Sequence, residues 1–155
     1  MSGKIDARLR EIGIELPQPS APVANYVPYT VSGNLVIISV QISVWGGKPE
    51  CAGKLGRDVS IEDGQRAARI CALNILAHLK TACGGDLDRV KRVLRLGGFV
   101  NCTADFTDMP QVVNGASNVM VEVFGDAGRH ARSAVGVYRL PLNFAVEVDA
   151  VVEVR

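Results

Sequence analysis

The chain has 155 residues, of which 48% are hydrophobic, and this suits one domain with a single core. Its 17 lysines and arginines nearly balance 16 aspartates and glutamates, so the basic excess of a nucleic-acid-binding protein is absent and such a partner is not expected. No apolar run approaches the roughly 20 residues of a membrane span, and no apolar stretch typical of a signal peptide follows the first residues, so we expect a cytoplasmic protein without membrane contact.

Residues 3–13 have the pattern of a short amphipathic helix, because Ile5, Leu9 and Ile12 recur at helical spacing among charged residues. Three prolines within residues 16–22 disfavour regular structure and predict an extended segment. We therefore predict that residues 1–20 form a helix and a linker, and that residues 21–155 form the single main domain.

Two β-branched and aromatic runs, residues 26–31 and 35–43, flank the turn sequence Ser32-Gly33-Asn34 and predict an antiparallel hairpin. Residues 45–58 contain four glycines and a proline, which is typical of an irregular loop. A long helix is predicted from Ser60, which can cap its first turn, to Gly84-Gly85.

A strand over residues 90–101 follows, and a second helix begins after Asp108, with a proline in its first turn, and ends at Gly125. Residues 133–140 and 144–154 are then expected to pair as a closing hairpin. This order predicts an α+β fold with one mixed sheet and both long helices on one face. The other face would carry Val135, Val137, Val151 and Val154, and closed oligomerisation is the economical way to bury them.

The cysteines and histidines show no spacing typical of a metal site. The four cysteines contain no CxxC pair, and His78 and His130 lie far apart in the sequence. We therefore predict no metal site and interpret the cysteines as buried residues or free thiols in a reducing compartment. His78, beside Leu79 in the first long helix, is interpreted as structural.

Arg132 lies at the start of the first closing strand, and Glu147 lies inside the second. If these strands pair as a hairpin, the two side chains can approach each other. Spacing alone leaves two interpretations open. One is a salt bridge at a strand end, and the other is a guanidinium fork that holds a substrate carboxylate while Glu147 handles protons.

The stretch from His130 to Pro141, followed by Val146-Glu147-Val148, resembles the signature of the YjgF/RidA family, which is also described as L-PSP endoribonuclease-like. Looser counterparts in the same order are Asn25-Tyr26, the turn at 32–35, the helix at 60–79 and residues 111–114. The similarity covers about residues 21–155.

This resemblance implies a chorismate-mutase-like fold and a homotrimer with clefts between its subunits. It also implies hydrolysis of reactive 2-imino and enamino acids to 2-keto acids and ammonia, without a cofactor. Arg132 would bind the substrate carboxylate, and Glu147 would position the attacking water. The other cleft residues that it implies are Tyr26, Asn114 and the backbone of Ser133 and Ala134. Two alternatives stay open: a non-catalytic module that binds small carboxylates such as 2-keto acids, and an endoribonuclease.

Two positions depart from the family pattern. The family usually has serine-glycine-glutamine where this chain has Ser39-Val40-Gln41, so Val40 is expected to narrow or reshape the cleft. The cysteine often found two residues after the arginine is replaced by Ala134. His130 lies two residues before Arg132, on the same side of an extended chain, and is a further candidate for contact with the cleft, although a surface position is the simpler interpretation.

Overall fold

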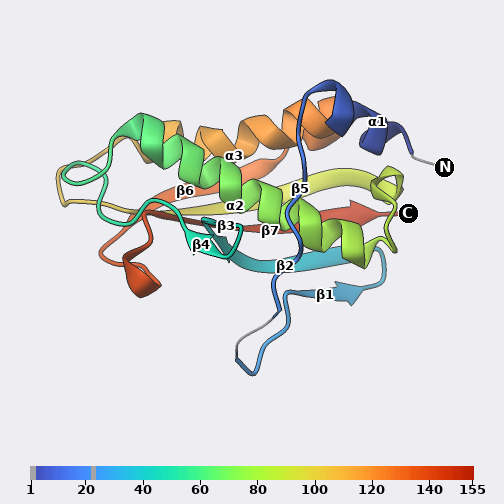
Figure 1. The fold of residues 1–155 in the computed structure, drawn as a ribbon, viewed down its shortest axis with the longest axis horizontal. Helices are drawn as coiled ribbons and strands as arrows, with labels where there is room; N and C mark the ends of the chain where they lie inside the picture. The colour runs from blue at the N-terminus through green and yellow to red at the C-terminus, as the bar shows by residue number, and fades with distance from the viewer. Residues whose placement is uncertain (1–2, 22–23) are drawn as a thin grey trace.

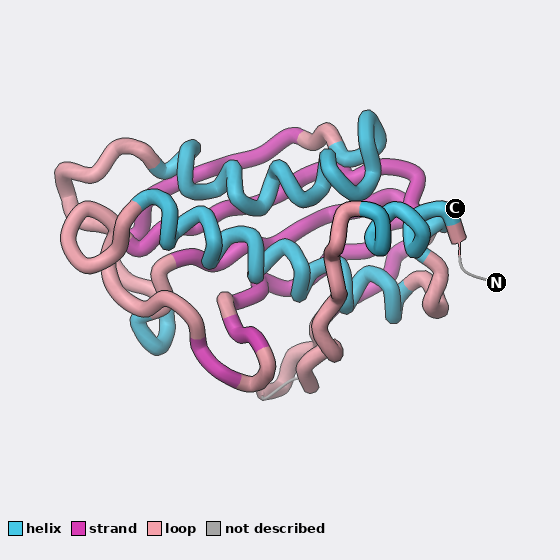
Figure 2. The backbone as a smooth tube through the Cα atoms, turned by 45° about the horizontal axis from the view of Figure 1, so that its top comes forward, coloured by secondary structure: helices cyan, strands magenta, loops and turns pink. Residues whose placement is uncertain are grey.

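A computed structural model of the protein describes residues 3–21 and 24–155, and its centre is a five-stranded sheet in the order β1-β2-β7-β5-β6 (Figure 1). Two long helices, α2 and α3, lie side by side over one face of this sheet (Figure 2). The predicted α+β class with a mixed sheet is confirmed. Within the described residues, no helix has the length and apolar character needed to cross a membrane.

The elements have the following bounds. The strands are β1 Tyr29–Ser32, β2 Leu35–Ile42, β3 Val44–Trp45, β4 Lys48–Pro49, β5 Val90–Asn101, β6 Ala131–Val137 and β7 Val146–Val154. The helices are α1 Lys4–Glu11, α2 Ile61–Ala82 and α3 Met109–Phe124, with 3-10 turns η1 Leu87–Arg89, η2 Gly125–Gly128 and η3 Pro141–Asn143. The predicted loop at 45–58 therefore contains part of the small β3–β4 hairpin.

The two long helices begin and end where their local sequences favour it. The Ser60 hydroxyl accepts the backbone N–H of Asp63 at 3.1 Å and so caps α2. Pro110 lies in the first turn of α3, and Gly125 ends that helix with a φ of +61°. Each helix buries one apolar side against the sheet, whose strands contribute alternate residues to the same core. The sheet residues in this core include Val36, Ile38, Leu96, Val100, Val148 and Val152.

The expected closing hairpin is wrong, because β6 does not pair with β7. Strand β6 runs parallel to β5, with Arg132 opposite Leu96, while β7 runs antiparallel to β5, with Ala150 opposite the same Leu96. The reason is that α3 carries the chain back over the sheet between β5 and β6, which makes a parallel β-α-β crossover. Strand β5 therefore separates β6 from β7.

The sheet face opposite the helices is uncovered within one chain and partly apolar, as expected. Ile37 and Val135 on this face are 46% and 42% exposed. Val151, opposite Ile37, and Val137 are half-buried. Val154 was expected on the uncovered face, and this is wrong: its side chain is buried in the core beneath the helices.

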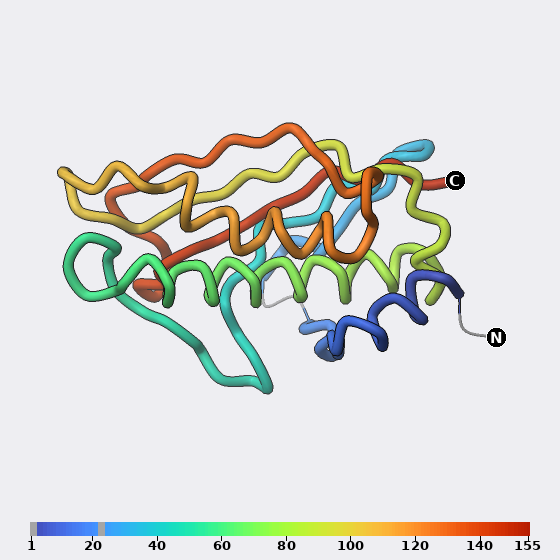
Figure 3. The backbone as a smooth tube through the Cα atoms, turned by 90° about the horizontal axis from the view of Figure 1, so that it is seen from above, coloured from blue at the N-terminus to red at the C-terminus, as the bar shows by residue number. Residues whose placement is uncertain are grey.

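The N-terminal segment is attached to the rest of the molecule by polar contacts and by burial. The Asp88 carboxylate accepts the backbone N–H groups of Lys4 and Ile5, both at 2.8 Å, at the start of α1. Leu9 and Ile14 are buried with the main core. The chain then crosses α2 (Figure 1), and the view from above in Figure 3 shows α1 on the outer side of this helix.

Replacing Gly115 in α3 by alanine is predicted to destabilise the protein, although alanine ordinarily stabilises a helix relative to glycine by about 0.5–1 kcal/mol. The two long helices are so close here that an added Cβ would overlap the backbone carbonyl of Gln65 in α2. We expect the free energy of unfolding to fall by about 1–3 kcal/mol in urea denaturation. Asn118→Ala, on the exposed side of the same helix, is the matched control, and an equal response of both variants would contradict the close approach.

Candidate functional site

Arg132 lies on the edge strand β6 and points toward α3. Its Nη1 donates to the Ser117 hydroxyl at 3.0 Å, and its Nη2 donates to the Pro110 carbonyl at 3.3 Å. The guanidinium is half-buried and is held by two elements that are far apart in the sequence. A fixed guanidinium with unused N–H groups can receive a planar carboxylate.

Ser117 connects Arg132 to His130. The Ser117 hydroxyl lies 2.9 Å from His130 Nε2, and His130 Nδ1 lies 2.6 Å from the Gly128 carbonyl. Because a carbonyl only accepts, Nδ1 carries the proton, and Nε2 therefore accepts from Ser117. Burial lowers the pKa of His130, and the charge of Arg132 lowers it further, which agrees with a neutral ring.

Glu147 lies on β7, opposite Phe99 of β5 and Ile42 of β2, and its side chain is on the face away from the helices. Only 7% of the residue is exposed, and it makes no hydrogen bond or ion pair with the described part of the chain. Burial raises the pKa of its carboxyl. A carboxyl in such surroundings can exchange protons closer to neutral pH than an exposed glutamate.

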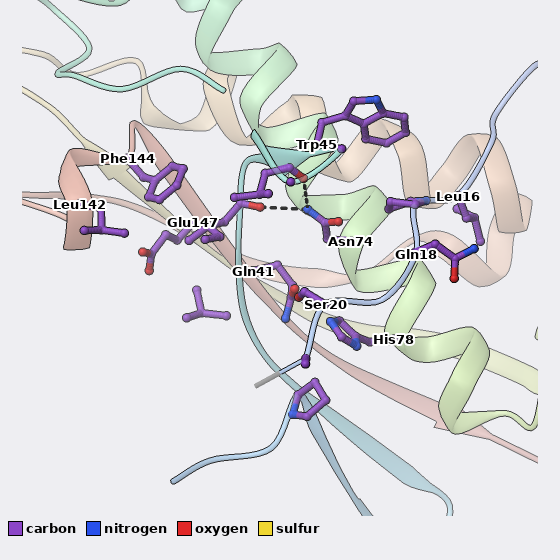
Figure 4. Close-up of a pocket in the computed structure, with 18 of the residues that line it drawn as sticks. Leu16, Gln18, Ser20, Gln41, Trp45, Asn74, His78, Leu142, Phe144 and Glu147 are labelled. Carbon is purple, nitrogen blue, oxygen red and sulfur yellow. Dashed lines mark hydrogen bonds between the residues drawn. The ribbon is translucent and has the colours of Figure 1, made fainter. Parts of the chain in front are cut away.

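Glu147 borders a pocket of about 940 Å³ at the edge of the sheet (Figure 4). Strand β1 begins opposite Ile38, so the last residues of β2 have no β1 neighbour on that side. The pocket occupies this place, between the end of β2, α2, the β3–β4 hairpin and residues 15–21. Of the predicted cleft residues, Tyr26 and Val40 line it together with Glu147.

The other predicted cleft residues do not line this pocket. Asn114 lies one turn before Ser117 on α3, near Arg132 rather than Glu147. Ser133 points to the uncovered face, where its hydroxyl accepts from Arg95 Nη2 at 3.2 Å. Ala134, opposite Gly98, packs against the core. The candidate residues therefore form two groups: His130, Arg132, Asn114 and Ala134 beside α3, and Tyr26, Val40 and Glu147 at the pocket.

Arg132 and Glu147 cannot meet within one chain, contrary to the hairpin expectation. Strand β5 lies between their strands, Arg132 points to the helix-covered face, and Glu147 points to the other face. A site that uses both side chains therefore requires two copies of the chain.

A sequence model described as "YjgF/chorismate mutase-like, putative endoribonuclease" matches residues 6–154. The chain belongs to this family. The predicted family is thus confirmed, and the match begins within α1 rather than near residue 21. Among curated proteins, Protein TCP17 of Trypanosoma cruzi is 47% identical over 99% of this chain and 96% of its own length.

Two solved structures of this YjgF-like fold are particularly similar. Protein Atu1372 from Agrobacterium tumefaciens is 48% identical, with a TM-score of 0.91 over 97% of this chain and 92% of that one. A "putative endoribonuclease" from Shewanella oneidensis MR-1 is 36% identical, with a TM-score of 0.93 over 98% and 100% of the two chains. The family match over residues 6–154 covers both groups of candidate residues.

The sequence did not point to Ser117, or to the pocket residues Gln41, Trp45 and Asn74. Ser117 could have been found from its spacing, since Asn114 and Ser117 are polar residues three positions apart and therefore lie on one side of α3. His78, interpreted as structural, is indeed buried, but its ring also lines the pocket.

Glu147→Gln is predicted to raise the free energy of unfolding at neutral pH. Burial raises the pKa of the Glu147 carboxyl, so folding favours its protonated form, and ionisation near neutral pH opposes folding. The gain should shrink as the pH falls from the raised pKa of the folded carboxyl toward the ordinary glutamate value of about 4.3, and it should be absent below that value, where both folded and unfolded chains bind the proton. Urea unfolding at neutral and acidic pH measures this, and the exposed Glu50→Gln is the control. If the difference in free energy of unfolding between Glu147→Gln and the unmodified protein does not change with pH, the raised pKa of Glu147 is contradicted.

Proposed function

We propose that the protein is a cytoplasmic homotrimer whose subunit clefts hydrolyse reactive 2-imino and enamino acids to 2-keto acids and ammonia. The observation that carries this proposal is the separation of Arg132 and Glu147 onto opposite faces of one sheet. Each half of the site is incomplete alone. A cleft formed by Arg132 of one copy and Glu147 of another would bring the carboxylate-binding group and the proton-handling group together.

The uncovered face supports assembly into a closed oligomer. Its exposed apolar side chains, Ile37 and Val135, flank a polar pair in which Arg95 Nη1 lies 3.7 Å from Asp149 Oδ1. Gly97 makes room for this pair, because a Cβ there would overlap the Asp149 carboxylate. Packing of copies around this face would bury the apolar residues and keep the charges paired, and a cyclic trimer would leave no such face open.

The proposed reaction needs orientation and proton transfer. Ser117 and the Pro110 carbonyl fix the Arg132 guanidinium, which uses two of its five N–H groups on them and has the others for the substrate carboxylate. Water adds to the C=N carbon while the Glu147 carboxylate takes a proton from it. The same carboxyl then returns the proton to the nitrogen, which gives a neutral carbinolamine. The Glu147 carboxylate next takes the proton of the new hydroxyl and passes it to the amine nitrogen, so the C–N bond breaks, ammonia leaves with the bonding electrons, and the C=O bond forms.

Two alternative functions are endoribonuclease activity and non-catalytic binding of 2-keto acids. The family description includes endoribonuclease, yet the net charge is +1, and the two histidines belong to separate groups, His78 at the pocket and His130 beside Ser117. Non-catalytic binding of 2-keto acids is favoured by Val40, whose side chain lies on the pocket where the family usually has glycine. Saturable 2-keto acid binding without imine hydrolysis would select this second function.

Arg132→Ala is expected to lower kcat/KM for 2-imino acid hydrolysis by about a hundredfold or more, because the substrate loses its oriented carboxylate contact. Arg132→Lys should recover only part of this, since a single ammonium cannot hold a carboxylate bidentately. A coupled assay with freshly generated imine measures both variants, and Arg92→Ala, on an exposed part of β5, is the control. Unchanged turnover in Arg132→Ala would refute the assigned role.

Mixing inactive variants tests whether the site is shared between copies. Glu147→Gln should lower kcat by about a hundredfold or more, yet co-refolding it with Arg132→Ala should restore activity, because some clefts then combine an intact Arg132 with an intact Glu147. Random assembly into a closed ring predicts about a quarter of the wild-type rate. Mass measurement by light scattering should give three chains. If a verified mixed assembly regains no activity, Arg132 and Glu147 belong to unrelated sites.

A further inference from the structure

The pocket extends well beyond Glu147 into a part that the proposed reaction does not use. Figure 4 shows Glu147, Leu142 and Phe144 toward one end, and Trp45, Asn74 and Leu16 toward the other. We call this second part the inner chamber and define it by Leu16, Pro17, Trp45, Asn74 and His78. The N-terminal segment supplies one wall, and α2 and the β3–β4 hairpin supply the others.

Asn74 presents a fixed acceptor to the inner chamber. Its Nδ2 donates to the carbonyls of Ile42 and Val44, both at 3.0 Å, so both amide hydrogens are used. The Oδ1 atom must then point away from these carbonyls, as Figure 4 shows, and it has no partner in the described part of the chain. This arrangement leaves a carbonyl oxygen that is able only to accept a hydrogen bond.

His78 lies one helical turn further along α2, on the same side as Asn74. The residue is 2% exposed, and its imidazole makes no hydrogen bond with the residues that the structure describes. Burial lowers the pKa of His78, so the ring is neutral near neutral pH and offers one donor and one acceptor. In the described residues no side-chain nitrogen or oxygen is both fully buried and without a partner, so the ring nitrogens of His78 are reachable from the pocket that the residue lines.

The remaining walls exclude one class of ligand and favour another. Trp45, Leu16 and Pro17 are large and apolar, and the described lining residues include Glu15 and Glu147 but no lysine or arginine. A second anionic group is therefore disfavoured. The volume of about 940 Å³ is near the upper end of the range for small-molecule sites, roughly 300–1,000 Å³, and leaves room for a ring-sized substituent.

We infer that the inner chamber binds the side chain of the substrate, and that this side chain is long, mainly apolar and ends in a neutral hydrogen-bond donor such as a phenol or an indole N–H. The single hydrogen of the donor is shared, as a bifurcated bond, between Asn74 Oδ1 and the unprotonated ring nitrogen of His78, and the apolar body packs on Trp45 and Leu16. The reacting end then lies near Glu147. The placement of this end rests on the proposed function, whereas binding of the side chain does not.

Two probes without a carboxylate test the chamber separately from catalysis. p-Cresol has an apolar ring and a hydroxyl donor, and 4-methylanisole has the same ring with the donor methylated. We expect the full-length protein to bind p-cresol more tightly by about five- to tenfold, the usual effect of one hydrogen bond. Calorimetry measures both affinities, and the fluorescence of Trp45, the single tryptophan of the chain, reports whether the chamber is occupied.

His78→Phe should remove most of the preference for p-cresol while retaining the binding of 4-methylanisole, because the ring is kept and its nitrogens are lost. His130→Phe, the same change at the other histidine of the chain, should leave the preference intact. In the unmodified protein, p-cresol should shift the imidazole resonances of His78 and not those of His130, which needs no variant at all. Equal binding of both probes, or no response of His78 and Trp45, would overturn the inference.

Turnover separates this inference from the proposed function. His78→Phe should raise KM about five- to tenfold for the imine derived from tyrosine, with little change for the imine derived from alanine, which is too short to reach the chamber. If Arg132→Ala keeps full activity while the p-cresol results hold, the proposed function fails and the chamber stands. If imine hydrolysis depends on Arg132 but p-cresol does not bind, the chamber assignment alone fails.

Discussion

Strand β5 lies between β6 and β7, and this position fixes where the two halves of the candidate site lie. Because α3 returns the chain parallel to β5, strand β6 is added at the outer edge of the sheet, while β7 pairs on the other side of β5. Arg132 is thereby directed toward α3, where Ser117 holds it, and Glu147 is directed to the uncovered face. The separation of these two groups is a property of the topology, which links the chemistry of the site to assembly of the chain.

The second determinant is the late start of β1. Since β1 pairs with β2 only as far as Ile38, the end of β2 has room beside it for the pocket. The β3–β4 hairpin and the N-terminal segment close around this room, and Asn74 ties the end of β2 and the hairpin to α2 through two carbonyls. The N-terminal segment is thus both a structural element, attached through Asp88, and a wall of the pocket.

Local patterns predicted most of the elements. The Ser60 cap, the proline in the first turn of α3 and the turn at Ser32-Gly33-Asn34 act within a few residues, so their effects could be inferred without knowing the fold. The predicted closing hairpin is wrong because β6 and β7, although adjacent in the sequence, both pair with β5 and not with each other. A crossover helix changes strand order without changing any local preference, so the error concerned the partner of β6 and not the existence of the strand.

The α+β class, the two long helices and the family signature around Arg132 and Glu147 could all be read from the sequence, because each depends on short-range periodicity or on residue identity. The folded chain was needed to show which faces these residues occupy, that Ser117 holds the guanidinium, and that His78 and Asn74 line a pocket with the N-terminal segment. The physical reason is that contacts between distant segments depend on strand order and helix packing, which no local pattern encodes.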